Sequence, residues 1–309
     1  MKVVFVVGPT ASGKSARALR WAKKYGGVIV NCDSVQCYRS LDIGSAKPTP
    51  AERNQLPHYL FDYIPEGETL TAGAYARDFS VLLEKLASEN TPLALVVGGT
   101  GFYFQAIEKG MYSIGVADPQ MISKLECEIA QKGSDGLWQE LALRDPDSAA
   151  RISKQDHYRI VRAIEMMRTH GKTPTEIKAE FERQQKPFPY PLLKVGINAG
   201  REELLPLVWQ RTQNMLQEGL LDEVRALVAK GLTNWAPLSS VGYRECLDYI
   251  SGKSTAQNPS ELAELITTAT LQLAKKQRTW FQRDKGIHWL PVSAAEAAGD
   301  ELLFRLGAH

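Results

Sequence analysis

The sequence predicts an α/β fold in which a parallel sheet core is interrupted by a mostly helical insertion. Three observations predict it. Short apolar runs alternate with helical segments over the first hundred residues, a glycine-rich phosphate-binding motif follows the first run, and a long helical stretch separates these strands from two later ones. Alternating strands and helices are typical of a doubly wound parallel sheet.

The strands predicted in the first hundred residues are continuous apolar runs. KVVFVV (2–7) comes first, VIVN (28–31) follows a helix predicted over 14–25, and LALVV (93–97) ends in two glycines. Strands buried on both faces have such runs in place of an alternation of apolar and polar residues. We therefore expect these strands to form the centre of the sheet.

Helical segments dominate from about Asp118 to Lys186, and no convincing strand pattern interrupts them. Within QDHYRIVRAIEMMRTHG, the residues Ile160, Ile164 and Met167 repeat at i, i+4 and i+7. This spacing places the three side chains on one face of a helix, which is the pattern of a helix that packs on a core.

The division of the chain follows from the point where the strand pattern resumes. LLKVGIN (192–198) predicts a strand that returns to the sheet. We therefore expect residues 1–117 and 192–309 to form one α/β core. Residues 118–191 are expected to form a helical insertion within it.

Two helices and a last strand are predicted after the insertion. Leu220, Val224 and Leu227 form one apolar helix face. Asn-Pro-Ser-Glu (258–261) resembles a helix start, with a capping residue, a proline in the first turn and a glutamate at the third position. HWLPV (288–292) is the candidate last strand.

Pro206 limits where the helix before Leu220 can begin. Proline lacks a backbone N–H and its ring crowds the preceding turn, so it is tolerated chiefly in the first turn of a helix. We therefore expect this helix to begin near Leu205.

The composition is that of a soluble globular protein, with 44% apolar and 23% charged residues in 309. No apolar run approaches the roughly 20 residues of a membrane helix, and the start of the chain lacks the cleavage site of a signal peptide. We therefore expect a cytoplasmic protein with no membrane partner. The four cysteines include no C-x-x-C pair, so neither a zinc site nor a disulfide framework is expected.

The formal net charge of +2 does not by itself indicate a nucleic-acid binder, but the charge is unevenly distributed. Residues 151–172 contain six Lys or Arg against two acids, and residues 275–285 contain five against one. Either segment could contact a polyanion, although a solvated helix face is the commoner meaning of such a run.

VFVVGPTASGKS (5–16) is the strongest functional signal. Gly8, Gly13, Lys14 and Ser15 fit the spacing G-x-x-x-x-G-K-[ST] of a phosphate-binding loop, with a strand predicted before it and a helix after it. In such a loop backbone N–H groups bind an anion, the lysine adds a positive charge and the hydroxyl reaches magnesium. The motif predicts a P-loop NTPase-like core. A triphosphate or a diphosphate would satisfy the same donors.

Asp33 follows the second strand, at the start of DSVQCYRSLDIGSAKP (33–48). Ligands of open α/β sheets lie beyond the carboxyl ends of the strands, so we expect Asp33 near the phosphate-binding loop. It would hold magnesium, as acids at strand ends do in ATPases and kinases, or act as a general base. A capping Asp in a turn is the structural alternative.

LVVGGTGFYF (95–104) is the third segment that is expected to face a ligand. Gly98, Gly99 and Gly101 let the backbone approach a ligand, and Thr100 offers a hydroxyl there. The predicted strand 93–97 does not end in an acid. If this strand occupies the place of the strand that usually holds magnesium, triphosphate chemistry is disfavoured. Segments from three strand ends are thus expected to converge on one site, which favours a P-loop transferase or a kinase.

Together these segments resemble the bacterial tRNA dimethylallyltransferases, also called tRNA isopentenyltransferases, of the IPP transferase family. GPTASGKS is similar to the family's form of the P-loop, DSVQCYRSLDIGSAKP to its second motif and GGTGFYF to its third. RISKQDHYRIVRAIEMMRTHGKTP, SSVGYRE and LAKKQRTWFQRD match later motifs in the expected order. The resemblance covers most of the chain.

The resemblance implies a prenyl transfer to RNA. The donor would be dimethylallyl diphosphate, with Mg²⁺ as cofactor and Ser15 as its protein ligand. The acceptor would be N6 of the adenosine immediately 3′ of the anticodon in tRNA, and diphosphate would be released. Asp33 would be the general base and Thr10 a second catalytic residue. The insertion would bind the anticodon stem, and no obligate protein partner is indicated.

The resemblance also implies two sets of contacts. Those to the diphosphate would be Gly8, Pro9, Thr10, Ala11, Ser12, Gly13, Lys14, Ser15 and Arg201. Those to tRNA would be Asp33, Ser34, Val35, Gln36, Thr100, His157, Tyr158, Arg159, Ile160, Val161, Arg162, Val241, Gly242, Tyr243 and Arg244.

Four positions depart from the family pattern. Ser45 stands where the family usually has threonine, which keeps the hydroxyl. Leu207 stands where many members carry a second arginine, so only Arg201 is assigned to the diphosphate. His157-Tyr158 replaces the more usual Pro-Gln.

The sequence leaves three other functions open. Transfer of the prenyl group to free adenine nucleotides would use the same chemistry, but the helical insertion and its basic segment favour tRNA. A P-loop small-molecule kinase or NTPase, with Asp33 on Mg²⁺, would be identified by ATP turnover. An RNA-binding module with an inactive P-loop is disfavoured, because Lys14, Ser15 and Asp33 are intact.

Overall fold

The computed structural model describes residues 1–111 and 118–307. The chain divides into two compact units, one of residues 1–108 with 188–309 and one of residues 109–187. The division thus lies nearer the N-terminus than the expected bounds of 118 and 191. The smaller unit ends at 187 rather than 191 because the ring of Phe188 packs edge-on against Phe5 of the sheet, with 5.8 Å between the ring centroids.

The larger unit is built on a six-stranded sheet in the order β3-β2-β4-β1-β5-β6, in which every neighbouring pair is parallel. The strands are β1 (Lys2–Val7), β2 (Val28–Asn31), β3 (His58–Tyr59), β4 (Leu93–Val97), β5 (Leu192–Asn198) and β6 (His288–Pro291). The fold class and five of these strands are as the sequence predicts. The two-residue strand β3 is too short to give a pattern.

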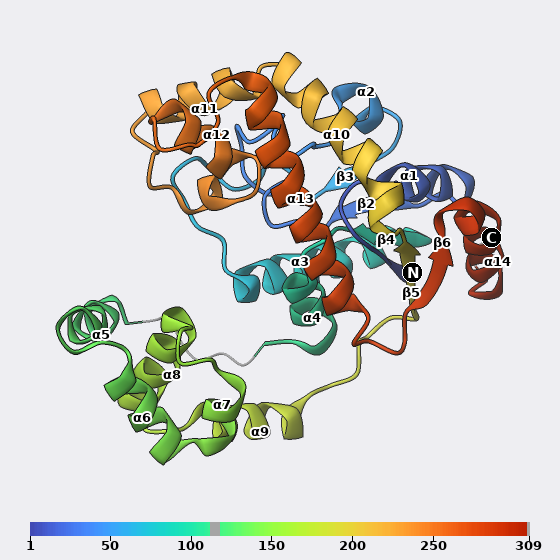
Figure 1. Cartoon of the computed structure of the whole chain (residues 1–309). Helices are drawn as coiled ribbons and strands as arrows, with labels where there is room; N and C mark the ends of the chain where they lie inside the picture. The colour runs from blue at the N-terminus through green and yellow to red at the C-terminus, as the bar shows by residue number, and fades with distance from the viewer. Residues whose placement is uncertain (112–117, 308–309) are drawn as a thin grey trace. The chain divides into compact units, whose positions relative to one another are not determined.

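The helices of this unit pack around the sheet and beside it (Figure 1). They are α1 (Lys14–Lys24), α2 (Pro50–Arg53), α3 (Ala72–Ser88), α4 (Gly101–Lys109, which ends at the boundary), α10 (Arg201–Gln217), α11 (Leu220–Ala229), α12 (Tyr243–Ile250), α13 (Pro259–Phe281) and α14 (Ala295–Arg305). Two short 3₁₀ segments, η1 (Ala236–Ser239) and η2 (Val292–Ala294), complete it.

Helix α10 begins earlier than expected, at Arg201, and holds Pro206 in its interior. The first turn is fixed by the carboxylate of Glu203, which accepts the backbone N–H of Gly200 at 2.7 Å. The helix then buries Leu204 and Val208 along its contact with α13. Packing of this apolar face outweighs the hydrogen bond that Pro206 cannot donate.

The smaller unit contains the helices α5 (Pro119–Lys132), α6 (Asp135–Arg144), α7 (Pro146–Arg151), α8 (His157–His170) and α9 (Pro174–Gln184). The predicted face of Ile160, Ile164 and Met167 is buried in its core. Helix α8 ends at Gly171, whose φ of 69° is the left-handed conformation common at helix ends.

The strand order places three ligand-facing segments side by side. Strand β1 lies between β4 and β5, and β2 lies on the other side of β4. The segments that follow β1, β2 and β4 therefore leave adjacent strands at the same edge of the sheet. Among the helices that the structure describes, none is long and apolar enough to cross a membrane.

Candidate functional site

The phosphate-binding loop joins the end of β1 to the start of α1. Gly8 has a φ of 146°, Ala11 a φ of 62° and Gly13 a φ of 78°, so three residues of the loop have a positive φ. The backbone N–H of Ser12 donates to the carbonyl of Pro9 at 3.3 Å and closes the turn. Such conformations point successive N–H groups into one concavity, which binds anions. Ser15 is exposed in the first turn of α1.

Three charged side chains meet at this loop. Burial lowers the pKa of Lys14 to about 8, the nearby Asp33 carboxylate opposes that shift, and the nearby Arg211 guanidinium adds to it. Burial also lowers the pKa of Arg211, and Asp33 again opposes the shift. Nη1 of Arg211 lies 3.4 Å from the hydroxyl oxygen of Thr10, to which it donates. Two cations beside one anion leave an excess positive charge that favours an anionic ligand.

Arg201 stays a predicted contact of the diphosphate, and within the described part of the chain it does not touch the loop itself. It is exposed in the first turn of α10. Arg211 lies ten residues further along the same helix, a rise of about 15 Å. The sequence contains a signal for Arg211. Leu207 stands where many family members carry a second arginine, and Arg211 lies one turn later on the same helix face.

The Asp33 carboxylate is held by the backbone around it. Oδ1 accepts the N–H of Val35 at 2.9 Å, and the N–H of Asp33 donates to the side-chain oxygen of Asn31 at 2.9 Å. Asn31 is fully buried and also donates to the carbonyl of Asp33 at 3.0 Å. None of the described residues hydrogen-bonds Oδ2 of Asp33, so this oxygen is available to accept a proton.

The ends of β2 and β4 approach each other closely at Gly98. A Cβ at this position would lie 2.0 Å from the carbonyl oxygen of Cys32, so only glycine fits. Beyond it, the hydroxyl of Thr100 accepts the backbone N–H of Ser34 at 3.0 Å and donates to the Ser34 hydroxyl at 3.2 Å. The sequence-predicted residues Thr100 and Ser34 are thus brought together.

Helix α13 supplies two contacts that the sequence does not predict. The side-chain oxygen of Gln277 accepts the backbone N–H of Thr10 at 2.8 Å. Cβ atoms added at Gly99 and Gly101 would lie 2.2 Å from the Gln277 amide nitrogen and 2.1 Å from the ring of Trp280. The glycines after β4 therefore let α13 pack directly on the site.

The exposed face of α13 combines positive charge with an aromatic ring. Trp280 is 38% exposed in a hollow of this surface. Cationic side chains with a stackable ring are the usual elements of a surface that binds single-stranded nucleic acid. The described lining residues are Gln272, Lys275, Lys276, Thr279, Trp280 and Arg283.

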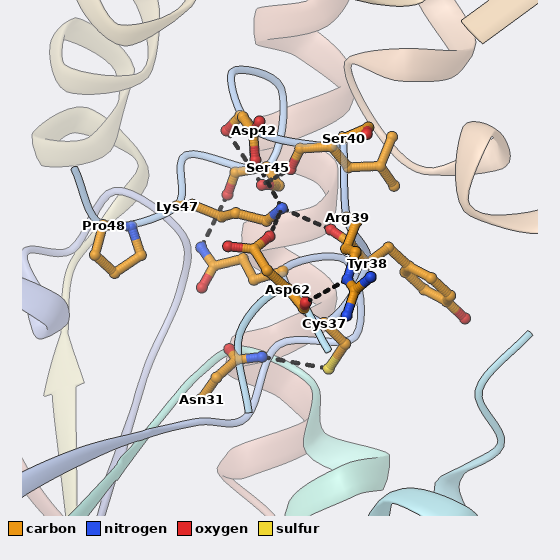
Figure 2. A network of polar contacts seen from close by, with 12 residues as sticks. Asn31, Cys37, Tyr38, Arg39, Ser40, Asp42, Ser45, Lys47, Pro48 and Asp62 are labelled. Atoms are coloured by element: carbon orange, nitrogen blue, oxygen red, sulfur yellow. Dashed lines mark hydrogen bonds and ion pairs between the residues drawn. The ribbon is translucent and has the colours of Figure 1, made fainter. Parts of the chain in front are cut away.

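A buried lysine organises the loop that follows Asp33 (Figure 2). Lys47 has a side chain only 4% exposed, and its ammonium donates to the carbonyl of Tyr38 at 2.6 Å and to the carboxylate of Asp42 at 2.8 Å. It also pairs with Asp62, whose other oxygen lies 2.6 Å from the guanidinium of Arg53. One side chain thus ties two parts of this loop to the segment that follows β3.

Gln36 is oriented by the same loop. Its amide nitrogen donates to the carbonyl oxygens of Ser45 and Ala46, at 2.9 and 3.1 Å. Both partners can only accept, so the amide nitrogen must face them and the amide oxygen faces elsewhere. Gln36 therefore presents an acceptor.

Replacing Lys47 with methionine is expected to lower the free energy of unfolding by about 2 kcal/mol, because three acceptors lose a buried cation while Asp62 keeps Arg53. Urea unfolding measures this. Arg53→Met is the matched control, since it removes the other partner of Asp62 and leaves Lys47 in place. An unfolding free energy that Lys47→Met leaves at the wild-type value would contradict the assigned role.

Tyr243 supports this loop from the other side. Its ring is buried, and its hydroxyl donates to Glu223 at 2.6 Å. The same carboxylate accepts the backbone N–H groups of residues 42–44 at 2.8 to 3.3 Å. Within the segment Val241–Arg244, the Tyr243 side chain is therefore structural. Arg244 is exposed and pairs with Glu245 at 2.8 Å.

Helix α8 of the smaller unit carries residues 157–162, which are expected to contact tRNA, and only some of them are exposed. His157, Tyr158 and Arg159 are exposed, and Tyr158 is 80% exposed. Ile160 and Val161 are buried in the core of the unit, so their side chains are not available to a ligand.

The two arginines of α8 each have an acidic partner. Arg159 lies 2.6 Å from Asp156, which also caps the helix by accepting the Arg159 N–H at 3.1 Å. Arg162 pairs with the buried Glu165 and is half-buried. Part of the positive charge counted in this segment is therefore neutralised within the unit.

Comparison of the sequence with known proteins identifies relatives of this chain. The family model described as IPP transferase matches residues 36–284. The chain belongs to the IPP transferase family. It is 52% identical over 288 residues to a tRNA dimethylallyltransferase of Bdellovibrio bacteriovorus, covering 93% of this chain and 92% of that protein. It is 36% identical over 294 residues to a tRNA dimethylallyltransferase of Koribacter versatilis, covering 95% and 94%.

Solved structures of IPP transferases share the fold. The full-length tRNA isopentenylpyrophosphate transferase of Bacillus halodurans matches with a TM-score of 0.71 and 28% identity, covering 99% of this chain and 97% of that one. A eukaryotic dimethylallyltransferase acting on tRNA matches with a TM-score of 0.82 over 98% of this chain and 77% of that one. Its identity of 23% supports the fold only.

Proposed function

We propose that this IPP transferase moves a dimethylallyl group from dimethylallyl diphosphate to N6 of the adenosine immediately 3′ of the anticodon in tRNA, and releases diphosphate. The observation that carries the proposal is the Asp33 carboxylate, which has one oxygen without a partner among the described residues and lies near the cations of the phosphate-binding loop. The names of the relatives, at 52% and 36% identity over nearly the whole chain, support the same activity.

The diphosphate would bind at the loop Gly8–Ser15. Backbone N–H groups of the loop, the Lys14 ammonium and the Arg211 guanidinium would contact its oxygens, and the charge that develops on the leaving diphosphate would be stabilised by the same groups. We assign this contact to Arg211 in place of Arg201, because Arg211 is the arginine that touches Thr10.

The donor set fits Mg²⁺ held mainly by the substrate. Mg²⁺ usually keeps several waters and takes only one or two protein ligands beside phosphate oxygens. Ser15, exposed in the first turn of α1, would be a ligand. The described residues contain no cluster of three or more His, Cys, Asp or Glu side chains suited to a metal. When bound, Mg²⁺ would neutralise negative charge on the diphosphate.

Asp33 would act as the general base. The exocyclic amine of adenine is a weak nucleophile because its lone pair is delocalised into the ring. As the N6–C1 bond forms and the C1–O bond to diphosphate breaks, Oδ2 of Asp33 would take a proton from N6. Gln36 presents an acceptor that suits the same amine, whereas a purine with a carbonyl at this position would place two acceptors together.

The tRNA would be bound mainly through its phosphates and an extruded base. A base in the anticodon loop must leave its stack to reach an enclosed site, and aromatic stacking commonly holds it. Exposed residues of three segments would contribute: His157, Tyr158 and Arg159 of α8, Arg244, and the basic face of α13 with Trp280. The helical insertion would thus contact the anticodon stem.

The affinity for the diphosphate is expected to fall as the pH rises through 8. The lowered pKa of Lys14 means that the free protein loses this cation at about pH 8, and the anion binds the protonated form better. The Kd for inorganic pyrophosphate should rise by up to tenfold per pH unit between pH 8 and 9.5. Calorimetric titration measures it. Lys14→Arg stays charged over this range and should abolish the slope, and a slope that survives in Lys14→Arg would assign it to another group.

The activity is tested by identifying the product. The protein is incubated with Mg²⁺, dimethylallyl diphosphate and unmodified tRNA, and the tRNA is digested to nucleosides for mass spectrometry. We expect N6-dimethylallyladenosine among the nucleosides. Unmodified nucleosides together with ATP hydrolysis in a parallel assay would instead identify a P-loop kinase or NTPase.

A further inference from the structure

Arg17 in the second turn of α1 contacts the back of the phosphate-binding loop. Its Nη1 donates to the carbonyl of Ser12 at 3.2 Å and to the carbonyl of Gly13 at 3.2 Å. The guanidinium lies directly against Gly13, since a Cβ there would be 2.5 Å from Nη1. Nη2 donates to the carbonyl of Val292 at 2.7 Å, while the buried Nε has no hydrogen-bond partner among the described residues.

These contacts hold two peptide planes of the loop: the side chain alone holds the Ser12 carbonyl, and at Gly13 it acts together with the backbone N–H of Arg17, which donates to the same carbonyl at 3.3 Å. In a trans peptide the C=O and the following N–H lie in one plane and point in opposite directions. When Arg17 holds the carbonyls of Ser12 and Gly13, the N–H groups of Gly13 and Lys14 point away from Arg17. That side of the loop is the one from which a phosphate-binding loop contacts its anion.

The third contact fixes the guanidinium to the end of the chain. Val292 begins η2, between β6 and α14. Helix α14 is held on α1 by separate contacts, since Arg20 pairs with Glu296 and Lys24 lies 2.8 Å from Asp300. Gly299 packs on the ring of Trp21. Arg17 therefore connects a separately anchored C-terminal segment to the loop (Figure 1 shows α1 beside α14).

We propose that Arg17 is a positioning residue for the prenyl donor: it holds the carbonyls of Ser12 and Gly13 so that the N–H groups of Gly13 and Lys14 face the diphosphate. The inference rests on the proposed function in taking the bound anion to be a diphosphate. The guanidinium suits this task because its planar fork serves several carbonyls at once, which a lysine ammonium on a flexible stem does not reproduce.

The variants separate positioning from stability. Arg17→Met keeps the length of the stem and removes the donors, and Arg17→Lys keeps the charge with a different geometry. Arg20→Met is the matched control, because it removes the α1–α14 ion pair and leaves the loop untouched. For each variant the Kd for inorganic pyrophosphate, the KM for dimethylallyl diphosphate and for tRNA, and the Tm are measured.

The expected result is specific to the diphosphate. Arg17→Met should raise the Kd for pyrophosphate and the KM for dimethylallyl diphosphate about tenfold, with the KM for tRNA unchanged and Arg17→Lys intermediate. Arg20→Met should change only the Tm. Wild-type pyrophosphate affinity in Arg17→Met, or an equal loss in Arg20→Met, would overturn the inference. If Arg17→Met does not fold, Arg17→Lys decides by the same comparison.

The two proposals fail in different ways. Pyrophosphate binding needs no tRNA and no transfer, so it tests Arg17 even if the wild-type protein transfers nothing. If the wild type binds pyrophosphate tightly but forms no prenylated tRNA, the proposed function is wrong and the Arg17 comparison stays valid. Normal transfer by Arg17→Met with unchanged kinetics would end the inference and leave the function standing.

Discussion

Asp33→Asn is expected to lower kcat by about 10²–10⁴-fold, because the amide cannot take the N6 proton as the C–N bond forms. The change keeps the size of the side chain and an oxygen able to accept the N–H of Val35, so the turn should survive. The Kd for tRNA should therefore change little. Single-turnover transfer with saturating tRNA measures kcat, and filter binding measures the Kd.

Asp42→Asn is the control for Asp33→Asn. Asp42 lies in the same loop, is 65% exposed and bonds to Lys47 rather than to the site. It should keep kcat near the wild-type value. If Asp33→Asn instead weakened tRNA binding and left kcat unchanged, Asp33 would be a binding residue and not the base.

Arg211→Met is expected to lower kcat/KM for dimethylallyl diphosphate by about 10²–10³-fold. The guanidinium sits beside Lys14 and Thr10, where it would contact the diphosphate and stabilise the charge that builds on it as it leaves. A half-buried cation at this place acts in a low dielectric and is little screened by salt. Steady-state kinetics with varied donor and saturating tRNA measure the loss.

Arg201→Met separates the two arginines of α10. Arg201 is exposed in the first turn of the helix and should be replaceable with a change in kcat/KM of less than about threefold. A larger loss in Arg201→Met than in Arg211→Met would restore the assignment that the family resemblance implies, and would remove Arg211 from the site.

The sequence predicted the parts of the fold that local pattern specifies. The runs 2–7, 28–31, 93–97 and 192–198 are the strands β1, β2, β4 and β5 with the same bounds. For β1, β2 and β4 the reason is that strands buried on both faces have apolar sequence with little alternation. The phosphate-binding loop was predictable for a similar reason, since its glycines and lysine are needed at fixed spacing. Strand β3 and the start of α10 depend on tertiary packing and were missed or misplaced.

The candidate site was predictable only where its residues follow a strand. Asp33 and Thr100 come directly after β2 and β4, so the topology brings them to the loop. Arg211 and Gln277 reach the loop from helices about 200 and 270 residues away, at 3.4 and 2.8 Å, so no strand end marks them in the sequence. A motif can also contain structural residues. Tyr243 was expected to contact tRNA, but its ring is buried and its hydroxyl bonds to Glu223.

The measurement that tests the account most directly is transfer from radiolabelled dimethylallyl diphosphate to three acceptors. These are an unmodified tRNA with A just 3′ of the anticodon, the same tRNA with G there, and free AMP. We expect label in the first tRNA alone. Label in AMP alone would move the acceptor to a free nucleotide, and equal label in both tRNAs would contradict an adenine-specific site at Asp33 and Gln36.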